Sequence, residues 1–207
     1  MKLEQAILEE DTIKVEKIIK ESLNENPKDI QLWIKLSLTE LQFPFEDYES
    51  ALQCLIQVYN IDSDNLDAII LETGIKWHSF GFIEEDLFKR LTKVRCSDSK
   101  KMAIIYYIQS LYYQYNNDKI NEKIVLQKSI KSYNGFVYPY KALSQISSSE
   151  LKFKESKELL KKAISNVQKI YQLDEVYDFT DIDTYIAEFI TGTSMSYSNF
   201  EEMKQLI

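Results

Sequence analysis

The chain has 207 residues, of which 44% are hydrophobic and 28% charged, a composition that suits one ordinary globular unit. Only 4 Gly and 3 Pro interrupt it, which is few for an all-β protein with many tight turns. The 33 Asp and Glu exceed the 25 Lys and Arg and leave a net charge of −8. This balance argues against a direct nucleic-acid partner and against an anionic membrane surface, because both need clustered cations. It permits a basic protein partner, although moderate negative charge also serves solubility alone.

The cysteines and the apolar runs are informative about the cellular location of the protein. Cys54 and Cys96 lie far apart in no CxxC pair, so no disulfide framework is implied. The N-terminal residues turn acidic at once, without a signal-peptide core, and the longest apolar run, residues 102–108, is too short to cross a bilayer. We therefore expect a cytoplasmic protein.

Apolar residues recur at helical spacing along the first part of the chain. Residues 3–23 predict an opening helical hairpin with a turn at 9–12, where Asp11 or Thr12 would cap the second helix. Residues 29–41 and 47–59 predict the next pair of helices. A weaker pair follows at 66–77 and 83–94, and its turn at 78–81 contains the chain's one histidine.

An internal repeat follows that pair. Residues 103–136 match residues 137–170 at one fixed offset of 34, the period of a tetratricopeptide helix–turn–helix unit. The matching pairs are Tyr106 and Tyr140, Ser110 and Ser144, Leu126 and Leu160, Ser129 and Ala163, and Ile130 and Ile164. The spacing predicts helices over 102–115, 119–133, 137–147 and 149–171, with a left-handed cap at Gly135 and a turn at 147–150.

The composition changes after Gln172. Five carboxylates arrive without a cation: Asp174, Glu175, Asp178, Asp181 and Asp183. Ile182, Ile186 and Phe189 indicate one short helix, and residues 199–207 could form a terminal capping helix over the end of a solenoid. Two interpretations of the acidic group stay open: a solvated loop, and a contact surface for a basic partner. Its spacing matches no calcium loop.

The paired helices resemble the tetratricopeptide-repeat family over residues 29–171. The resemblance implies an all-α solenoid of about ten helices in antiparallel hairpins, and we expect one domain over residues 1–207. Such repeats bind peptides or proteins on a concave face that the first helix of each pair lines. On that basis the groove would be lined by Ile34, Leu38, Leu41, Ile104, Tyr107, Leu111, Tyr138, Lys141 and Gln145. Members that clamp a chaperone tail carry Lys and Asn where this chain has Tyr107 and Leu111, so we do not expect that ligand.

The sequence gives little support for chemistry. His78 has no second histidine or suitably spaced cysteine to complete a zinc site, and Cys54 is expected to be internal. No glycine-rich phosphate motif is present. We therefore expect no catalytic residue, no cofactor and no metal, although an enzyme that uses the carboxylates or a tyrosine remains the alternative from another class.

The expected function is non-catalytic protein binding. The most concrete hypothesis is an immunity protein that neutralises a basic, nuclease-type toxin through the five acidic residues. The alternative is an adaptor or assembly factor that holds a peptide against Tyr107, Leu111, Tyr138 and Lys141. Fold alone does not decide between them.

Overall fold

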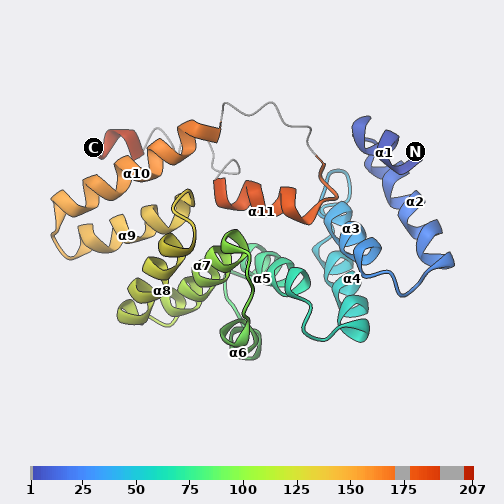
Figure 1. The fold of residues 1–207 in the computed structure, drawn as a ribbon, viewed down its shortest axis with the longest axis horizontal. Coiled ribbons are helices and arrows are strands. Elements are labelled where there is room, and N and C mark those ends of the chain that lie inside the picture. Colours follow the sequence, from blue (N-terminus) through green and yellow to red (C-terminus); the bar gives the residue numbers. More distant parts are fainter. Residues whose placement is uncertain (1, 171–177, 192–202) are drawn as a thin grey trace. The chain divides into compact units, whose positions relative to one another are not determined.

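The computed structural model describes residues 2–170, 178–191 and 203–207, with side chains for 3–167, 178–186 and 203–207. Every labelled element in these ranges is an α-helix, which confirms the all-α prediction (Figure 1). Helices that follow one another pack as antiparallel neighbours in the pairs α1 with α2, α3 with α4, α7 with α8, and α9 with α10. The helices are α1 (Lys2–Leu8), α2 (Thr12–Glu25), α3 (Ile30–Glu40), α4 (Tyr48–Ile61), α5 (Leu66–Phe80), α6 (Glu85–Lys93), α7 (Ser99–Tyr115), α8 (Lys119–Ser132), α9 (Val137–Ser149), α10 (Phe153–Ile170) and α11 (Ile182–Thr191).

The chain divides into two compact units. The N-terminal unit comprises Met1–Gly81 together with Val176–Tyr185, and the C-terminal unit comprises Phe82–Glu175 together with Ile186–Ile207. The boundary therefore falls inside the weak pair expected over residues 66–94. That the two units form one domain over residues 1–207 stays a prediction.

Short polar side chains start most of the helices. The side chains of Asp11, Asp29, Asp47, Asn65, Asp98 and Asp118 each accept a hydrogen bond from a backbone N–H in the first turn of the helix that follows. Such caps satisfy donors that the helix itself leaves unpaired, and each typically stabilises by about 1 kcal/mol. Asp11 rather than Thr12 fills the role at α2. Phe136 precedes α9 and gives no side-chain cap.

One backbone feature marks the turn inside each helix pair. A residue with positive φ stands there at a spacing of 34 to 36 residues: Glu10, Glu46, Gly81, Asn117 and Leu151. This left-handed conformation reverses the chain after a helix. It falls at Leu151 and not at Gly135, so the predicted left-handed cap at Gly135 is wrong. A Cβ on Gly135 would lie 2.7 Å from the ring of Tyr133, so close packing accounts for this glycine.

The repeat over 103–170 packs as its spacing predicts. Ser129 and Ala163 are fully buried at equivalent places, and Ser129 Oγ donates to the Ala103 carbonyl at 2.7 Å across α7 and α8. Ser144 and Ser156 pair at 2.8 Å across α9 and α10. Small side chains thus let the two helices of each pair approach closely.

The turn between α9 and α10 lies later than expected. Residues 147–149 continue α9, and α10 begins at Phe153 rather than at Ser149. Ser147 is buried in the last turn of α9, and Ser149 Oγ donates to the Ile146 carbonyl at 2.7 Å. The short terminal helix is present at 203–205, where Met203 is buried and Leu206 is exposed.

Candidate protein-interaction surfaces

Tyr107 of α7 and Tyr138 of α9, two of the residues expected to line the groove, lie side by side. Their rings stack with centroids 5.7 Å apart, and both meet the edge or face of Phe136, at 5.1 Å and 6.2 Å. Phe136 is fully buried. Burial, with a smaller contribution from Tyr138, raises the pKa of Tyr107 far above its ordinary value, so its hydroxyl stays protonated and unreactive. Sequence reasoning missed Phe136, whose signal is an aromatic residue at a helix start where α2, α3, α4, α5, α7 and α8 carry Asp or Asn.

The remaining groove residues are less available than expected. Leu111 is 6% exposed, and Ile34, Leu38 and Ile104 are each 1% exposed, so they form core between helices. The prediction that they line an open face is wrong, because each apolar side chain fills the space between packed helices. Lys141, one turn after Tyr138, and Leu41 are half-buried, whereas Gln145 is exposed.

Two of the five predicted acidic residues have a local structural role. Asp178 Oδ1 accepts hydrogen bonds from the Thr180 amide at 2.8 Å and its hydroxyl at 2.7 Å. Asp181 Oδ2 accepts from the Thr184 amide at 2.9 Å and its hydroxyl at 3.1 Å, which caps α11. Asp183 is exposed on α11. Asp174 and Glu175 lie outside the described residues.

The same acidic stretch packs on the first helices of the chain. Phe179 is 6% exposed and belongs to a core cluster with Ile19, Leu36 and Cys54. The Lys35 ammonium donates to the Thr180 hydroxyl at 3.2 Å, and Thr180 is fully buried. Sequence reasoning missed this return of the chain. Its only local signal is the sequence Phe-Thr between acidic residues.

Gly74 of α5 gives the segment a further contact. A Cβ there would collide with the Tyr185 hydroxyl, so the side chain of Tyr185 lies directly against the backbone of α5. A glycine inside a helix costs about 1 kcal/mol relative to alanine. The close approach of Tyr185 accounts for a glycine at this position.

The formal charges of the two units have opposite signs. The N-terminal unit carries 19 Asp and Glu against 7 Lys and Arg, a net charge of −12. The C-terminal unit carries 14 against 18, a net charge of +4. The total of −8 therefore averages two unlike parts. That no nucleic acid binds directly stays a prediction.

The candidate chemical groups do not form a reactive site in the described residues. Burial and the nearby Glu40 raise the pKa of the Cys54 thiol to about 12, so this thiol is not a nucleophile. Cys96 donates to the Asp98 carbonyl at 3.4 Å. His78 is exposed in the last turn of α5 rather than in a turn. No group of three metal-ligating side chains occurs within the described part of the chain.

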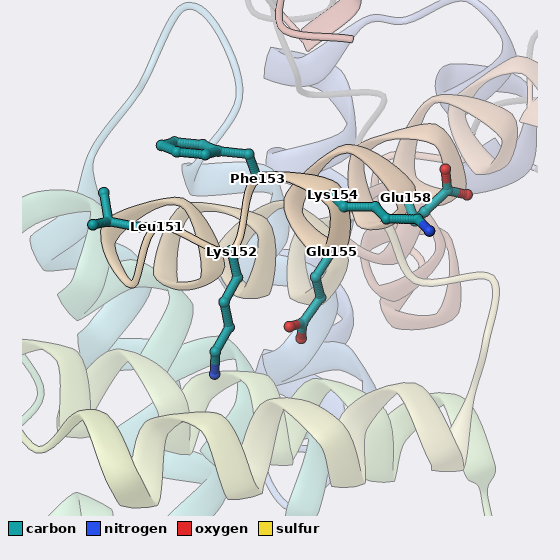
Figure 2. A pocket seen from close by; sticks show the side chains of 6 residues that line it. All are labelled: Leu151, Lys152, Phe153, Lys154, Glu155 and Glu158. Carbon is teal, nitrogen blue, oxygen red and sulfur yellow. The ribbon is translucent and has the colours of Figure 1, made fainter.

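A shallow depression lies at the start of α10. Its lining comes from one stretch of chain: Leu151, Lys152, Phe153, Lys154, Glu155 and Glu158. Figure 2 shows these side chains diverging from the turn and the helix instead of converging on one point. The arrangement offers no enclosed place for a small substrate.

Structure comparison identifies the fold. Two crystal structures of MamA, a tetratricopeptide-repeat protein, match at 16% and 17% identity with TM-scores of 0.64 and 0.62. They cover 83% and 85% of this chain and 97% and 94% of their own. The MamA RS-1 ArsTM double mutant matches at 12% identity and TM-score 0.65, over 81% of this chain and 92% of its own. At such identities the likeness shows the fold alone.

Comparison at the level of sequence gives no relative. No family model and no curated protein matches the chain. Among the described residues, no helix is both long enough and apolar enough to cross a membrane.

Proposed function

We propose that the chain is a non-catalytic scaffold that binds another protein. The observation that carries this proposal is the fold: paired antiparallel helices in the arrangement seen in MamA, with a positive-φ residue recurring in the turn inside each pair. Repeat folds of this kind present extended surfaces to partners. The buried thiol of Cys54 and the diverging side chains at the start of α10 fit the same reading, since neither offers a reactive site.

Affinity capture tests the proposal. The tagged full chain is incubated with a lysate of its source cells, and the retained proteins are identified by mass spectrometry, with the tag alone as control. We expect one protein to be enriched in near-stoichiometric amount. Failure to retain any protein above the control, under gentle washing, would count against a scaffold.

The charge of the N-terminal unit supports a second, more specific hypothesis, that the partner is basic. A net charge of −12 attracts a cationic protein over long range and speeds its association. An immunity protein bound to a basic toxin is one form of this hypothesis. It predicts that the captured partner is a toxin domain, encoded beside this chain's gene, whose activity the chain blocks.

Neutralising variants separate the acidic surface from the groove. Replacing Asp178, Asp181 and Asp183 by Asn keeps an oxygen that can still accept the threonine hydrogen bonds, while the charge is removed. Asp174→Asn and Glu175→Gln complete the variant. If the acidic surface binds, association should slow and its salt dependence shrink, because exposed charges are screened over about 8–10 Å.

The groove alternative predicts a different kinetic signature. Tyr107→Ala removes one ring of the stacked pair with Tyr138 and should speed dissociation from the captured partner. Lys141→Ala should act in the same direction, whereas Leu111 is too buried to serve as a contact. Surface plasmon resonance at two salt concentrations measures both variants. Unchanged binding by the neutralised variant at low salt would exclude the acidic surface.

A further inference from the structure

Among its described residues, the N-terminal unit has its buried aromatic ring in the returning segment and not in residues 1–81. Among the described residues of Met1–Gly81, the buried apolar side chains are aliphatic or Cys. Phe179, 6% exposed, supplies the ring to the cluster that contains Ile19, Leu36 and Cys54. An aromatic side chain in such a place is a typical anchor of a bound peptide.

Two further contacts of the segment lie on α3 and α5. Lys35 of α3 donates to the Thr180 hydroxyl at 3.2 Å, and Gly74 of α5 lets Tyr185 approach the helix backbone. Residues 178–185 therefore meet α3 and α5 much as a short ligand would, with an apolar anchor, a polar contact and a second aromatic.

The segment is organised by its own hydrogen bonds. Asp178 holds Thr180 and Asp181 holds Thr184, each through two bonds of 2.7 to 3.1 Å. A segment that is already ordered loses less entropy on binding. A segment of another protein could have the same two features: an aromatic residue, followed by the capped start of a helix.

The segment and the helices on which it lies both carry net negative charge. Residues 178–185 bring three Asp and no cation, while Met1–Gly81 carries 16 Asp and Glu against 7 Lys and Arg. Like net charges repel, so apolar and hydrogen-bond contacts must hold the segment in place. A ligand with the same anchors and positive charge would gain attraction where this segment meets repulsion.

We propose that the face of α3 and α5 is a peptide-binding site that residues 178–185 fill, and that a basic partner segment with an aromatic anchor before a helix start displaces them. The proposal rests on the proposed function of protein binding and adds the place and the partner's chemistry. It also makes this site self-inhibited: the chain's own segment competes with every ligand.

The test uses the full chain and a fluorescent peptide of residues 178–185 that carries Asp183→Lys and two added C-terminal lysines, so that its side chains are net positive while Asp178 and Asp181 keep their capping roles. Two variants weaken the resident segment. Phe179→Ala removes the anchor, and Gly74→Ala crowds the flexible end of Tyr185 while placing a better helix former in α5. Leu151→Ala, a 75% exposed position in the C-terminal unit, is the control.

We expect both variants to bind the peptide at least about tenfold more tightly than wild type, because only molecules with an open face are competent. Leu151→Ala should bind like wild type. A peptide that also carries Phe179→Ala should bind to none of them. Hydrogen exchange should show that the added peptide restores protection to α3 and α5 in the variants.

The proposal is overturned if Gly74→Ala remains folded and binds no more peptide than wild type does. It is equally overturned if Gly74→Ala unfolds the N-terminal unit, since the segment would then be inseparable core. Either result leaves the capture experiment untouched: a partner retained by wild type would still establish a scaffold, one that binds elsewhere.

Discussion

The two units use the same helical pairs but complete their cores differently. The C-terminal unit buries Phe136 from its own repeat, at the start of α9, between Tyr107 and Tyr138. The N-terminal unit obtains Phe179 from a segment more than a hundred residues away in the chain. An aromatic supplied by the repeat is fixed by local sequence. One supplied by a returning segment can in principle be exchanged for a ligand, so an interaction site is more readily built in the N-terminal unit.

Phe136→Ala should have the largest effect and should act on the C-terminal unit. Removing a fully buried ring leaves a cavity between Tyr107 and Tyr138, and such changes lower the free energy of unfolding by about 3–5 kcal/mol. Urea unfolding followed by circular dichroism measures this. Tyr115→Ala, at a 60% exposed ring, is the control and should change little. Equal losses in the two variants would show that Phe136 is not an essential part of this core.

Overpacking one buried alanine in each unit should show whether the two units unfold separately. Ala51 in α4 and Ala163 in α10 are both fully buried. Ala51→Leu and Ala163→Leu should each lower the free energy of unfolding by about 1–3 kcal/mol. Hydrogen exchange should assign the first loss to the N-terminal unit and the second to the C-terminal unit.

The control for this pair of variants is Lys162→Leu on the exposed side of α10. It is preferable to Lys157→Leu, because the Lys157 ammonium donates to the Ile207 carbonyl at 2.7 Å. If Lys162→Leu were as destabilising as Ala163→Leu, the assignment of the buried side of α10 would be wrong.

The repeat was predictable because its signals are local. The offset that pairs Ser110 with Ser144 and Ser129 with Ala163 identified the buried side of each helix correctly, since side-chain spacing decides which face packs. Aspartates before helices marked their starts for the same reason. The turn at Leu151 was missed because a bulky apolar residue in a left-handed conformation has no sequence signal.

The candidate sites were less predictable because they depend on contacts distant in sequence. No sequence spacing predicts that Phe179 packs against helices near the N-terminus. The opposite net charges of the two units are hidden when only the charge of the whole chain is counted. The expected groove included Leu111 and Ile104, which helical periodicity places on an apolar face without saying whether another helix covers it. The three-dimensional structure is needed to tell a buried apolar face from an exposed one.

Added salt should stabilise the two units to different extents, and this difference should be smaller than the effects of the substitutions above. Screening relieves self-repulsion most where like charges are densest, and the N-terminal unit has a net charge of −12 against +4 in the other. Raising the ionic strength to the physiological value should strengthen amide protection in α2 to α4 by about 1 kcal/mol or less and leave α8 and α9 nearly unchanged. An equal increase of amide protection in both units would mean that their net charges do not determine the effect of salt.

The smallest expected effect concerns Glu150, in the turn between α9 and α10. Lys123 of α8 donates to both carboxylate oxygens at 2.8 Å, and Lys152 donates to one at 2.7 Å. These bonds lower the pKa of Glu150 to about 2 from an ordinary value of 4.5. Because the folded-state pKa is the lower one, the stabilisation is complete above pH 4.5 and is lost as the pH falls towards 2. The pair is exposed and screened, so its total contribution is small.

Glu150→Gln should therefore lower the urea midpoint slightly at pH 7, and the difference from wild type should shrink as the pH is lowered from 5 to 3. Glu49→Gln, at an exposed carboxylate in the first turn of α4 in the other unit, is the control and should leave the amide protection of α8 and α9 unchanged. The effect should appear in the amide protection of α8 and α9 and be absent from α2 and α3, because both lysines belong to the C-terminal unit. A constant difference at all pH values would mean that Glu150 acts through its size or its hydrogen bonds rather than through its charge.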